Sequence, residues 1–260
     1  MTPAPPALAL LAAAAFAAGA LNSVAGGGTL LTFPALTAVV SPALANTTST
    51  VALLPGSLAG AWGYRRELGR AGPLLVRLLP PSFLGGAIGA GLLLAAPARF
   101  GPLVPWLILT TAVLFLVQHP LSKRLRRRAA DPTTYTPGPR LVAALVGFQF
   151  GVAVYGGYFG AGIGILMLTA LGFMGVADIH RANAVKTVLA AAINVTSAAL
   201  FAVGGEVRWD LAAVMAAAAI VGGYAGARVA RRLPAWTVRW VVVAIGFGLA
   251  AFYFIEQARA

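Results

Sequence analysis

Long apolar runs, each close to the length of a bilayer crossing, follow one another along most of this chain. A transmembrane helix needs roughly 20 predominantly apolar residues to cross about 30 Å of hydrocarbon. Only 10% of the residues are charged, whereas a soluble domain has about 25%, so most of the surface cannot face water. The runs that predict single crossings are residues 47–63, 74–96, 103–118, 184–203, 211–229 and 236–255.

The charge balance and the residue types exclude several classes of protein. The chain has 19 Lys and Arg against 6 Asp and Glu. Nucleic-acid-binding proteins carry such an excess as a patch on a polar domain, but here the basic residues cluster between apolar runs, as in cytoplasmic loops of membrane proteins. There is no cysteine and there are only two histidines. We therefore expect no nucleic-acid partner, no metal and no cofactor.

The first apolar stretch, from Leu8 to Ala25, could be taken for a signal peptide. Signal peptides carry a basic segment before their apolar core, and the first basic residue here is Arg65. We therefore treat the stretch as part of the structure. The missing basic flank also predicts an N-terminus outside the cytoplasm.

This stretch continues to residue 44, and residues 141–177 form a second stretch of similar length. Both are too long for one crossing, and they contain glycine clusters at residues 22–28 and 155–164. Glycine inside a helix costs about 1 kcal/mol relative to alanine, so each cluster predicts a helix break. Each stretch is either two crossings or one re-entrant hairpin of two half-helices, which must be covered by protein or line a watery cavity. Arms of about 16 residues favour hairpins over full crossings.

An internal repeat relates the two halves of the chain. A shift of 137 places aligns Asn46 with Asn183 and Ser57 with Asn194, and a shift of 135 aligns the glycine-rich breaks. The same shift of 137 aligns the glycines at positions 85 and 89 with those at 222 and 226. Such spacing allows helix backbones to approach closely, so we predict packing sites there. A nearly constant offset over tens of residues indicates a duplication.

The distribution of Lys and Arg selects an orientation for the two halves. If each broken stretch returns to the side from which it entered, 16 basic residues face the cytoplasm and 3 face outward. If each stretch crossed once, the division would be 12 and 7. The positive-inside rule favours the first case, which places both termini outside and the two halves in inverted orientation. Two full crossings per stretch give the same division, so charge does not exclude them.

These observations predict an all-α polytopic membrane protein built as an inverted repeat. Each half is a glycine-broken re-entrant hairpin followed by three transmembrane helices, and transporters of this design bind substrate near the midplane. A homodimer is compatible with it. The predicted parts are the first repeat at residues 1–122 with its hairpin at 8–44, the basic cytoplasmic linker at 123–140, and the second repeat at 141–260 with its hairpin at 141–177.

Several segments carry a resemblance to a known family. They are NSVAGGGTLLTFPAL at residues 22–36, ANTTST at 45–50 and GYRREL at 63–68, with YGGYFGAGIG at 155–164, NAVK at 183–186 and Asn194 in the second half. Over nearly its whole length the chain resembles the TauE/SafE permeases. The resemblance implies a bacterial inner-membrane permease of the sulfite exporter type, which moves sulfite, sulfoacetate or related organosulfonates. Ala161 and Ile163 interrupt what is often an unbroken glycine run, which leaves the substrate open.

The glycine clusters are the first candidates for an anion site. Half-helices that begin near Thr29 and Ile165 would point free N–H groups into the protein, and a helix N-terminus attracts anions. The alternative is that the glycines only permit tight turns and close packing. The candidate residues at these tips are Gly26, Gly27, Gly28, Thr29, Gly160, Gly162 and Gly164.

Polar residues inside the apolar runs form a second set of candidates. Five polar residues, from Asn46 to Thr50, open a predicted span, where they could cap the helix or contact the ligand; we select Asn46, Thr47 and Thr50. Ser57 and Asn194 are expected about 16 Å into their spans. They either line the transport pathway or bond across helices.

Asn183 and Lys186 are one turn apart at the start of another span. A lysine within a membrane costs roughly 2.5–3.5 kcal/mol on insertion scales and usually faces a cavity. Lys186 therefore either contacts the anion or extends its ammonium to the cytoplasmic surface.

The function expected from these features is secondary-active transport of a small sulfur-containing anion by alternating access in a lipid bilayer, with a proton as a candidate coupled ion. An anion channel and a permease for another anion are the alternatives. An intramembrane enzyme would need a nucleophile with its base, or an acidic metal site, within the membrane. None of the six acidic residues falls within the middle of a predicted span, so we predict that the protein is not an enzyme.

The predicted topology can be tested by cysteine labelling, because the chain contains no cysteine. Ala130→Cys should be protected from a membrane-impermeant thiol reagent in intact cells and labelled after lysis, because the basic linker faces the cytoplasm. Thr2→Cys is the control and should be labelled in intact cells. Labelling of position 130 before lysis would contradict the topology.

Overall fold

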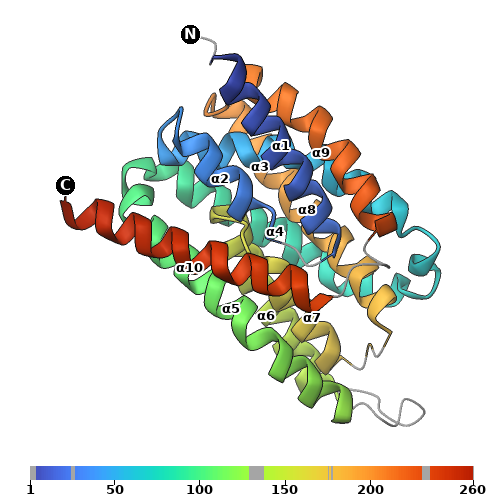
Figure 1. Ribbon diagram of the computed structural model, residues 1–260. Coiled ribbons are helices and arrows are strands. Elements are labelled where there is room, and N and C mark those ends of the chain that lie inside the picture. Colours follow the sequence, from blue (N-terminus) through green and yellow to red (C-terminus); the bar gives the residue numbers. More distant parts are fainter. Residues whose placement is uncertain are drawn as a thin grey trace.

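The computed structural model describes residues 4–24, 27–128, 138–174, 176, 178–229 and 235–259. Within these ranges the chain forms α-helices and two short 3-10 helices, η1 and η2, and no strand (Figure 1). The elements are α1 Pro5–Val24, α2 Thr29–Thr37, α3 Pro42–Gly63, η1 Glu67–Arg70, α4 Gly72–Ala95, η2 Pro97–Arg99, α5 Phe100–Arg128, α6 Pro139–Tyr158, α7 Ile163–Phe173, α8 Ile179–Val203, α9 Trp209–Val229 and α10 Ala235–Arg259.

Six helical segments in the described ranges are long and apolar enough to cross a membrane. Large apolar side chains cover the outside of the helices; Val203 is 88% exposed and Val76 is 73% exposed. Apolar surface of this extent indicates contact with lipid. The chain is therefore a multi-pass membrane protein. The six segments are Pro5–Ser23, Gly72–Ala95, Pro97–Leu114, Pro139–Tyr158, His180–Val203 and Trp209–Gly226.

Both predicted helix breaks are confirmed. The first lies between α1 and α2, and the second lies between α6 and α7. Gly27, Gly160 and Gly162 have φ angles of 96°, 81° and 78°, a conformation that other residues adopt only with strain. These turns therefore require glycine.

The two arms of each broken stretch differ in length, whereas we expected arms of about 16 residues. α1 and α6 each have 20 residues, but α2 has 9 and α7 has 11. α2 and α7 are short because α3 and α8 begin before the predicted residues 47 and 184. α3 begins at Pro42, whose ring is suited to a first helical turn, and α8 begins after Asp178, whose side chain accepts the N–H of His180 at 2.9 Å.

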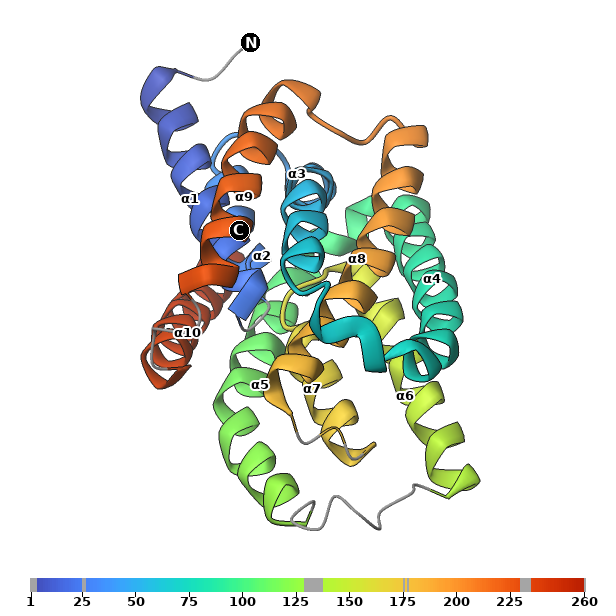
Figure 2. The same cartoon turned by 90° about the vertical axis from the view of Figure 1, so that its right-hand side faces the viewer.

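The two broken stretches enter the protein from opposite ends. Figure 1 shows α1 descending from the end that carries the N-terminus and α6 rising from the other end, with both turns in the middle. Figure 2 shows α3 and α8 in the centre, with α1 and α9 on one side of them and α4 and α6 on the other. The central helices therefore meet both turns.

The paired glycines lie where helices pack most closely, which confirms their predicted packing role. A Cβ on Gly85 of α4 would lie 2.6 Å from Ala153 Cβ of α6. A Cβ on Gly226 of α9 would likewise overlap Ala20 of α1. Any side chain at these positions would push the helices apart, so glycine sets the distance between α4 and α6 and between α9 and α1.

The basic linker predicted at residues 123–140 is partly helical. α5 continues through the basic cluster to Arg128, and α6 begins at Pro139. Residues 129–137 lie outside the described ranges. The basic residues from 123 to 128 therefore extend α5 instead of forming the start of a loop.

Gly89 provides a test of the packing between α4 and α6. A Cβ at this position would meet the backbone of Val154 and Tyr158, so Gly89→Ala should destabilise the protein by about 1–3 kcal/mol through overpacking. Gly91, on the same helix, has nothing within 4 Å of the position that a Cβ would take. Gly91→Ala should therefore leave the melting temperature in detergent unchanged or slightly higher. Equal melting temperatures for both variants would contradict this packing.

Candidate functional site

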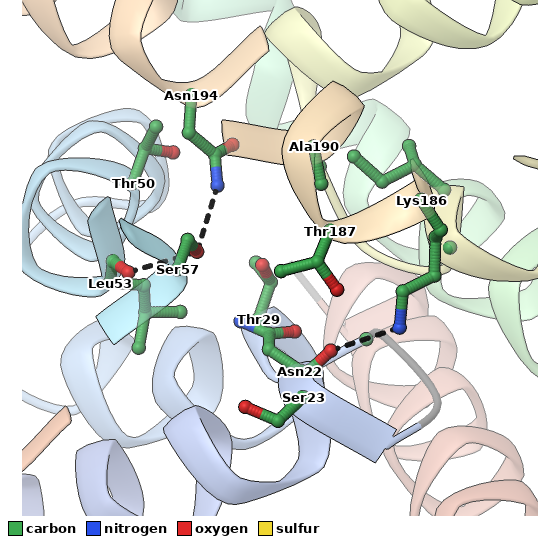
Figure 3. Close-up of a pocket in the computed structure, with 14 residues that line it drawn as sticks. Asn22, Ser23, Thr29, Thr50, Leu53, Ser57, Lys186, Thr187, Ala190 and Asn194 are labelled. Atoms are coloured by element: carbon green, nitrogen blue, oxygen red, sulfur yellow. Dashed lines mark hydrogen bonds between the residues drawn. The ribbon is translucent and has the colours of Figure 1, made fainter. Parts of the chain in front are cut away.

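A cavity lies where the two glycine turns meet the central helices α3 and α8 (Figure 3). The space inside it and at its opening, open solvent included, is about 600 Å³. None of the lining residues is acidic. They are Asn22, Ser23, Gly27, Thr29, Thr50, Leu53, Ser57, Gly160, Ile163, Gly164, Lys186, Thr187, Ala190 and Asn194.

The N-termini of α2 and α7 both lie at this cavity. α2 begins at Thr29 and α7 begins at Ile163, two residues before the expected start near Ile165. The first N–H groups of a helix have no acceptor within the helix and carry its partial positive charge. The two turns are close together, since a Cβ on Gly160 would lie 3.8 Å from Thr29 Oγ1. The N-termini of both helices therefore border one space, while the N–H groups of Leu30, Leu31 and Thr32 are already bonded to the carbonyl oxygens of Gly27 and Gly28.

Asn22 stabilises the turn between α1 and α2. Its Oδ1 accepts the backbone N–H of Gly28 at 2.7 Å. The side chain thereby joins the last turn of α1 to the residue that precedes α2. This bond fixes the direction in which α2 leaves the turn.

Lys186 is buried and does not reach the surface. Its side chain lies on α8, is 1% exposed, and donates from Nζ to the carbonyl oxygen of Asn22 at 3.2 Å (Figure 3). No ion pair to Lys186 is found among the described residues, where Arg208 pairs with Asp210 at 2.6 Å. A buried charge without a counter-ion is costly. The cavity therefore has the amine of Lys186 at one side, where a bound anion would favour its charged form.

Ser57 and Asn194 face each other across the cavity from α3 and α8. Asn194 Nδ2 donates to Ser57 Oγ at 3.5 Å, the upper limit for a hydrogen bond. Ser57 Oγ also donates to the carbonyl oxygen of Leu53 at 3.1 Å. The contact between the helices is thus weak, and both polar groups remain at the cavity wall.

The five polar residues from Asn46 to Thr50 do not cap α3, so the capping interpretation is wrong. α3 begins at Pro42, and the run lies in its second and third turns. Five consecutive residues point in all directions around a helix of 3.6 residues per turn. Among the selected candidates, Thr50 lines the cavity, while Thr47 donates to the carbonyl oxygen of Glu206 and Asn46 donates to that of Tyr158 at 2.9 Å. Most of the run joins α3 to other parts of the protein.

The cavity contains eight of the 14 candidate residues. It lacks Gly28, Asn46, Thr47, Gly162 and Asn183, and Gly26 lies outside the described ranges. The sequence interpretation missed six lining residues. A shift of 137 aligns Thr187 with the candidate Thr50, so applying the repeat to every candidate would have found Thr187. The missed residues are Asn22, Ser23, Leu53, Ile163, Thr187 and Ala190.

The fold and the buried polar cavity are those of a multi-pass helical membrane transporter. Residues 11–253 match the family described as Sulfite exporter TauE/SafE. The chain belongs to this family.

Curated relatives agree with this assignment. A "Probable membrane transporter protein" of Haemophilus influenzae is 31% identical over 258 residues, covering 96% of this chain and 95% of the relative. The "Probable membrane transporter protein YfcA" of Escherichia coli K12 is 30% identical over 226 residues, covering 84% of this chain and 77% of the relative. A Sinorhizobium protein, "Probable membrane transporter protein ORF9", is 28% identical, covering 94% and 90%. No solved structure matches the chain.

Substitution of the facing pair tests whether the cavity binds a ligand. Ser57→Leu and Asn194→Leu should each abolish any thermal stabilisation of the purified protein by a ligand that binds in this cavity, because leucine fills the space and removes a polar group. Val195→Leu is the control, since Val195 is 39% exposed on the outer side of α8. Normal stabilisation of both cavity variants would place the ligand elsewhere and leave the pair as a helix–helix contact.

Proposed function

We propose that this protein is a secondary-active permease for a small sulfur-containing anion, such as sulfite, sulfoacetate or a related organosulfonate. The observation that carries the proposal is the charge arrangement of the cavity. Two helix N-termini and the ammonium of Lys186 adjoin one buried space that has no acidic lining residue. Such a space attracts an anion and disfavours a cation.

The polar lining suits an oxyanion in particular. The hydroxyl groups of Thr29 and Thr187 lie between Lys186 at one side of the cavity and Asn194 at the other (Figure 3). Each of these side chains can donate a hydrogen bond, and the oxygens of a sulfite or sulfonate group can accept several. Leu53 and Ala190 add a small apolar wall, which can accommodate the short carbon chain of an organosulfonate.

Alternating access between two inverted halves is the mechanism that we propose. The helix contacts support it because they occur in equivalent pairs: α1 packs on α9 as α6 packs on α4, and α3 packs on α9 as α8 packs on α4. The opposite directions of the two broken stretches agree with such a relation (Figure 1). Transporters of this design bind substrate where the broken helices meet.

The proposed location is the bacterial inner membrane, with both termini in the periplasm. The charge division between the loops supports this orientation. Proton coupling would not need a carboxylate at the cavity, because sulfite can carry a proton itself.

A binding screen is the direct test of the proposed function. Purified protein should be stabilised by one or more of sulfite, thiosulfate, sulfoacetate and taurine in preference to sulfate and chloride. In proteoliposomes a permease should show saturable uptake and counterflow of the labelled anion, whereas a channel shows neither. A preference for a non-sulfur anion would contradict the substrate class but keep the transport mechanism.

Lys186 variants test the charge in the cavity. Lys186→Met keeps much of the bulk and removes the ammonium, so the protein should fold while anion affinity falls about tenfold or more, the equivalent of one lost charge-assisted bond. Lys186→Arg keeps the charge but replaces a compact ammonium with a planar fork, so affinity should be intermediate. Anion affinity should also be higher in the inward-open state, because Ser49 is the uncharged equivalent of Lys186 in the first half. Unchanged transport by Lys186→Met at normal expression would show that the helix ends bind the anion without it.

A further inference from the structure

The C-terminal ends of α1 and α6 both lie inside the protein, but different donors satisfy them. The last four carbonyl groups of a helix have no donor within the helix and carry its partial negative charge. At the end of α1, Lys186 Nζ donates to the carbonyl oxygen of Asn22 at 3.2 Å, and the hydroxyl group of Tyr64 donates to that of Ser23 at 3.2 Å. The end of α1 therefore has a cation that the chain itself supplies.

The end of α6 receives no such cation in the described part of the chain. Asn46 Nδ2, a neutral donor, bonds to the carbonyl oxygen of Tyr158 at 2.9 Å. Among the described residues, no hydrogen bond is found to the carbonyl oxygens of Gly156 or Gly157. Two of the last four carbonyl oxygens of α6, those of Gly156 and Gly157, thus lack a donor among the described residues.

Asn46 provides a second, independent observation at the same place. Its side chain is 1% exposed, and its Oδ1 atom is buried without a hydrogen-bond partner. The amide nitrogen already bonds to Tyr158, so the unpartnered oxygen of the same amide group lies beside the end of α6. Rotating the amide would bring two acceptors together, so the hydrogen bond fixes its orientation. A buried acceptor of this kind attracts a cation and repels an anion.

The internal repeat shows what the first half lacks. A shift of 137 aligns Asn46 with Asn183 and Ser49 with Lys186. Asn183 Oδ1 is also buried without a partner, but the ammonium of Lys186 is one turn away on the same helix. Ser49 brings no charge and bonds to Thr32 Oγ1 at 2.6 Å. The first half therefore keeps the acceptors and has no cation of its own.

We propose that a Na⁺ ion binds at the C-terminal end of α6, with Asn46 Oδ1 and the carbonyl oxygens of the last turn of α6 as its ligands. In the internal repeat, this site is equivalent to the position of the Lys186 ammonium at the end of α1. Ca²⁺ and Mg²⁺ sites use carboxylates, whereas these ligands are neutral, which suits a monovalent ion. Coupling cations in transporters bind at such helix ends. The inference goes beyond the proposed anion transport, because Asn46 does not line the cavity.

The first experiment measures the stability of the wild-type protein in different chloride salts. Purified protein in detergent is heated in NaCl, KCl or choline chloride at equal concentration, so that the anion is constant. NaCl should raise the melting temperature in a saturable way, and choline chloride should not. The absence of a Na⁺-specific effect, or an equal effect of KCl, would overturn the proposal. No sulfur anion is present, so the outcome is independent of the proposed substrate.

Repeat-related variants then locate the ion. Asn46→Ala removes a ligand and should weaken the apparent Na⁺ affinity at least about tenfold, the scale of loss typical of altered metal sites. Asn183→Ala removes the equivalent amide beside the internal ammonium and should keep the wild-type Na⁺ response. Asn46→Asp replaces the amide donor with a second acceptor that faces the carbonyl oxygen of Tyr158, so its stability should depend on Na⁺, which would lie between these oxygens. A melting temperature of Asn46→Asp that does not respond to Na⁺, or equal losses of Na⁺ affinity in both alanine variants, would overturn the assignment.

Discussion

Two helices of this protein, α1 and α6, end in its interior, and their last carbonyl groups must find donors there. In lipid, no water can satisfy a free backbone group, so each helix end within the membrane must be covered by protein or by a polar cavity. The chain meets this requirement with side chains from the central helices. Lys186 of α8 donates a hydrogen bond to a carbonyl oxygen at the end of α1, and Asn46 of α3 donates one at the end of α6. The position of α3 and α8 between the two turns follows from this requirement.

The same turns create the cavity, because a helix that ends inside the protein leaves room for another to begin. α2 and α7 start directly after the turns, and their N-termini add partial positive charge to the space that the C-termini leave. Glycine is needed at the turns for its positive φ and on α4 and α9 for close packing. These two uses of glycine are separate: one sets the shape of the cavity, and the other holds the flanking helices against α1 and α6.

The two halves differ in charge at their aligned positions, although their helices pack in equivalent ways. Lys186 places a fixed cation at the end of α1, whereas the aligned Ser49 leaves the end of α6 with neutral ligands only. Two aligned helix ends, one beside a lysine and one beside neutral groups, have different electrostatic preferences. This difference supports the two proposed sites, one for an anion in the cavity and one for Na⁺ at the end of α6.

The sequence by itself determined the membrane location, both helix breaks and the close packing at the paired glycines. The first two properties are local, because hydrophobicity and glycine conformation depend on the residue and its neighbours in the chain, and the spacing of the paired glycines marks a helix face that allows close approach. It also selected Thr29, Ser57, Lys186 and Asn194 as candidates, and the structure brings these four residues to one cavity. Only the tertiary structure decided which way each side chain points. α3 begins five residues before the predicted start at residue 47, so Asn46 lies inside the helix instead of capping it. Asn46 consequently bonds to the end of α6 and not to the cavity, because its contacts depend on a turn more than 100 residues away in sequence.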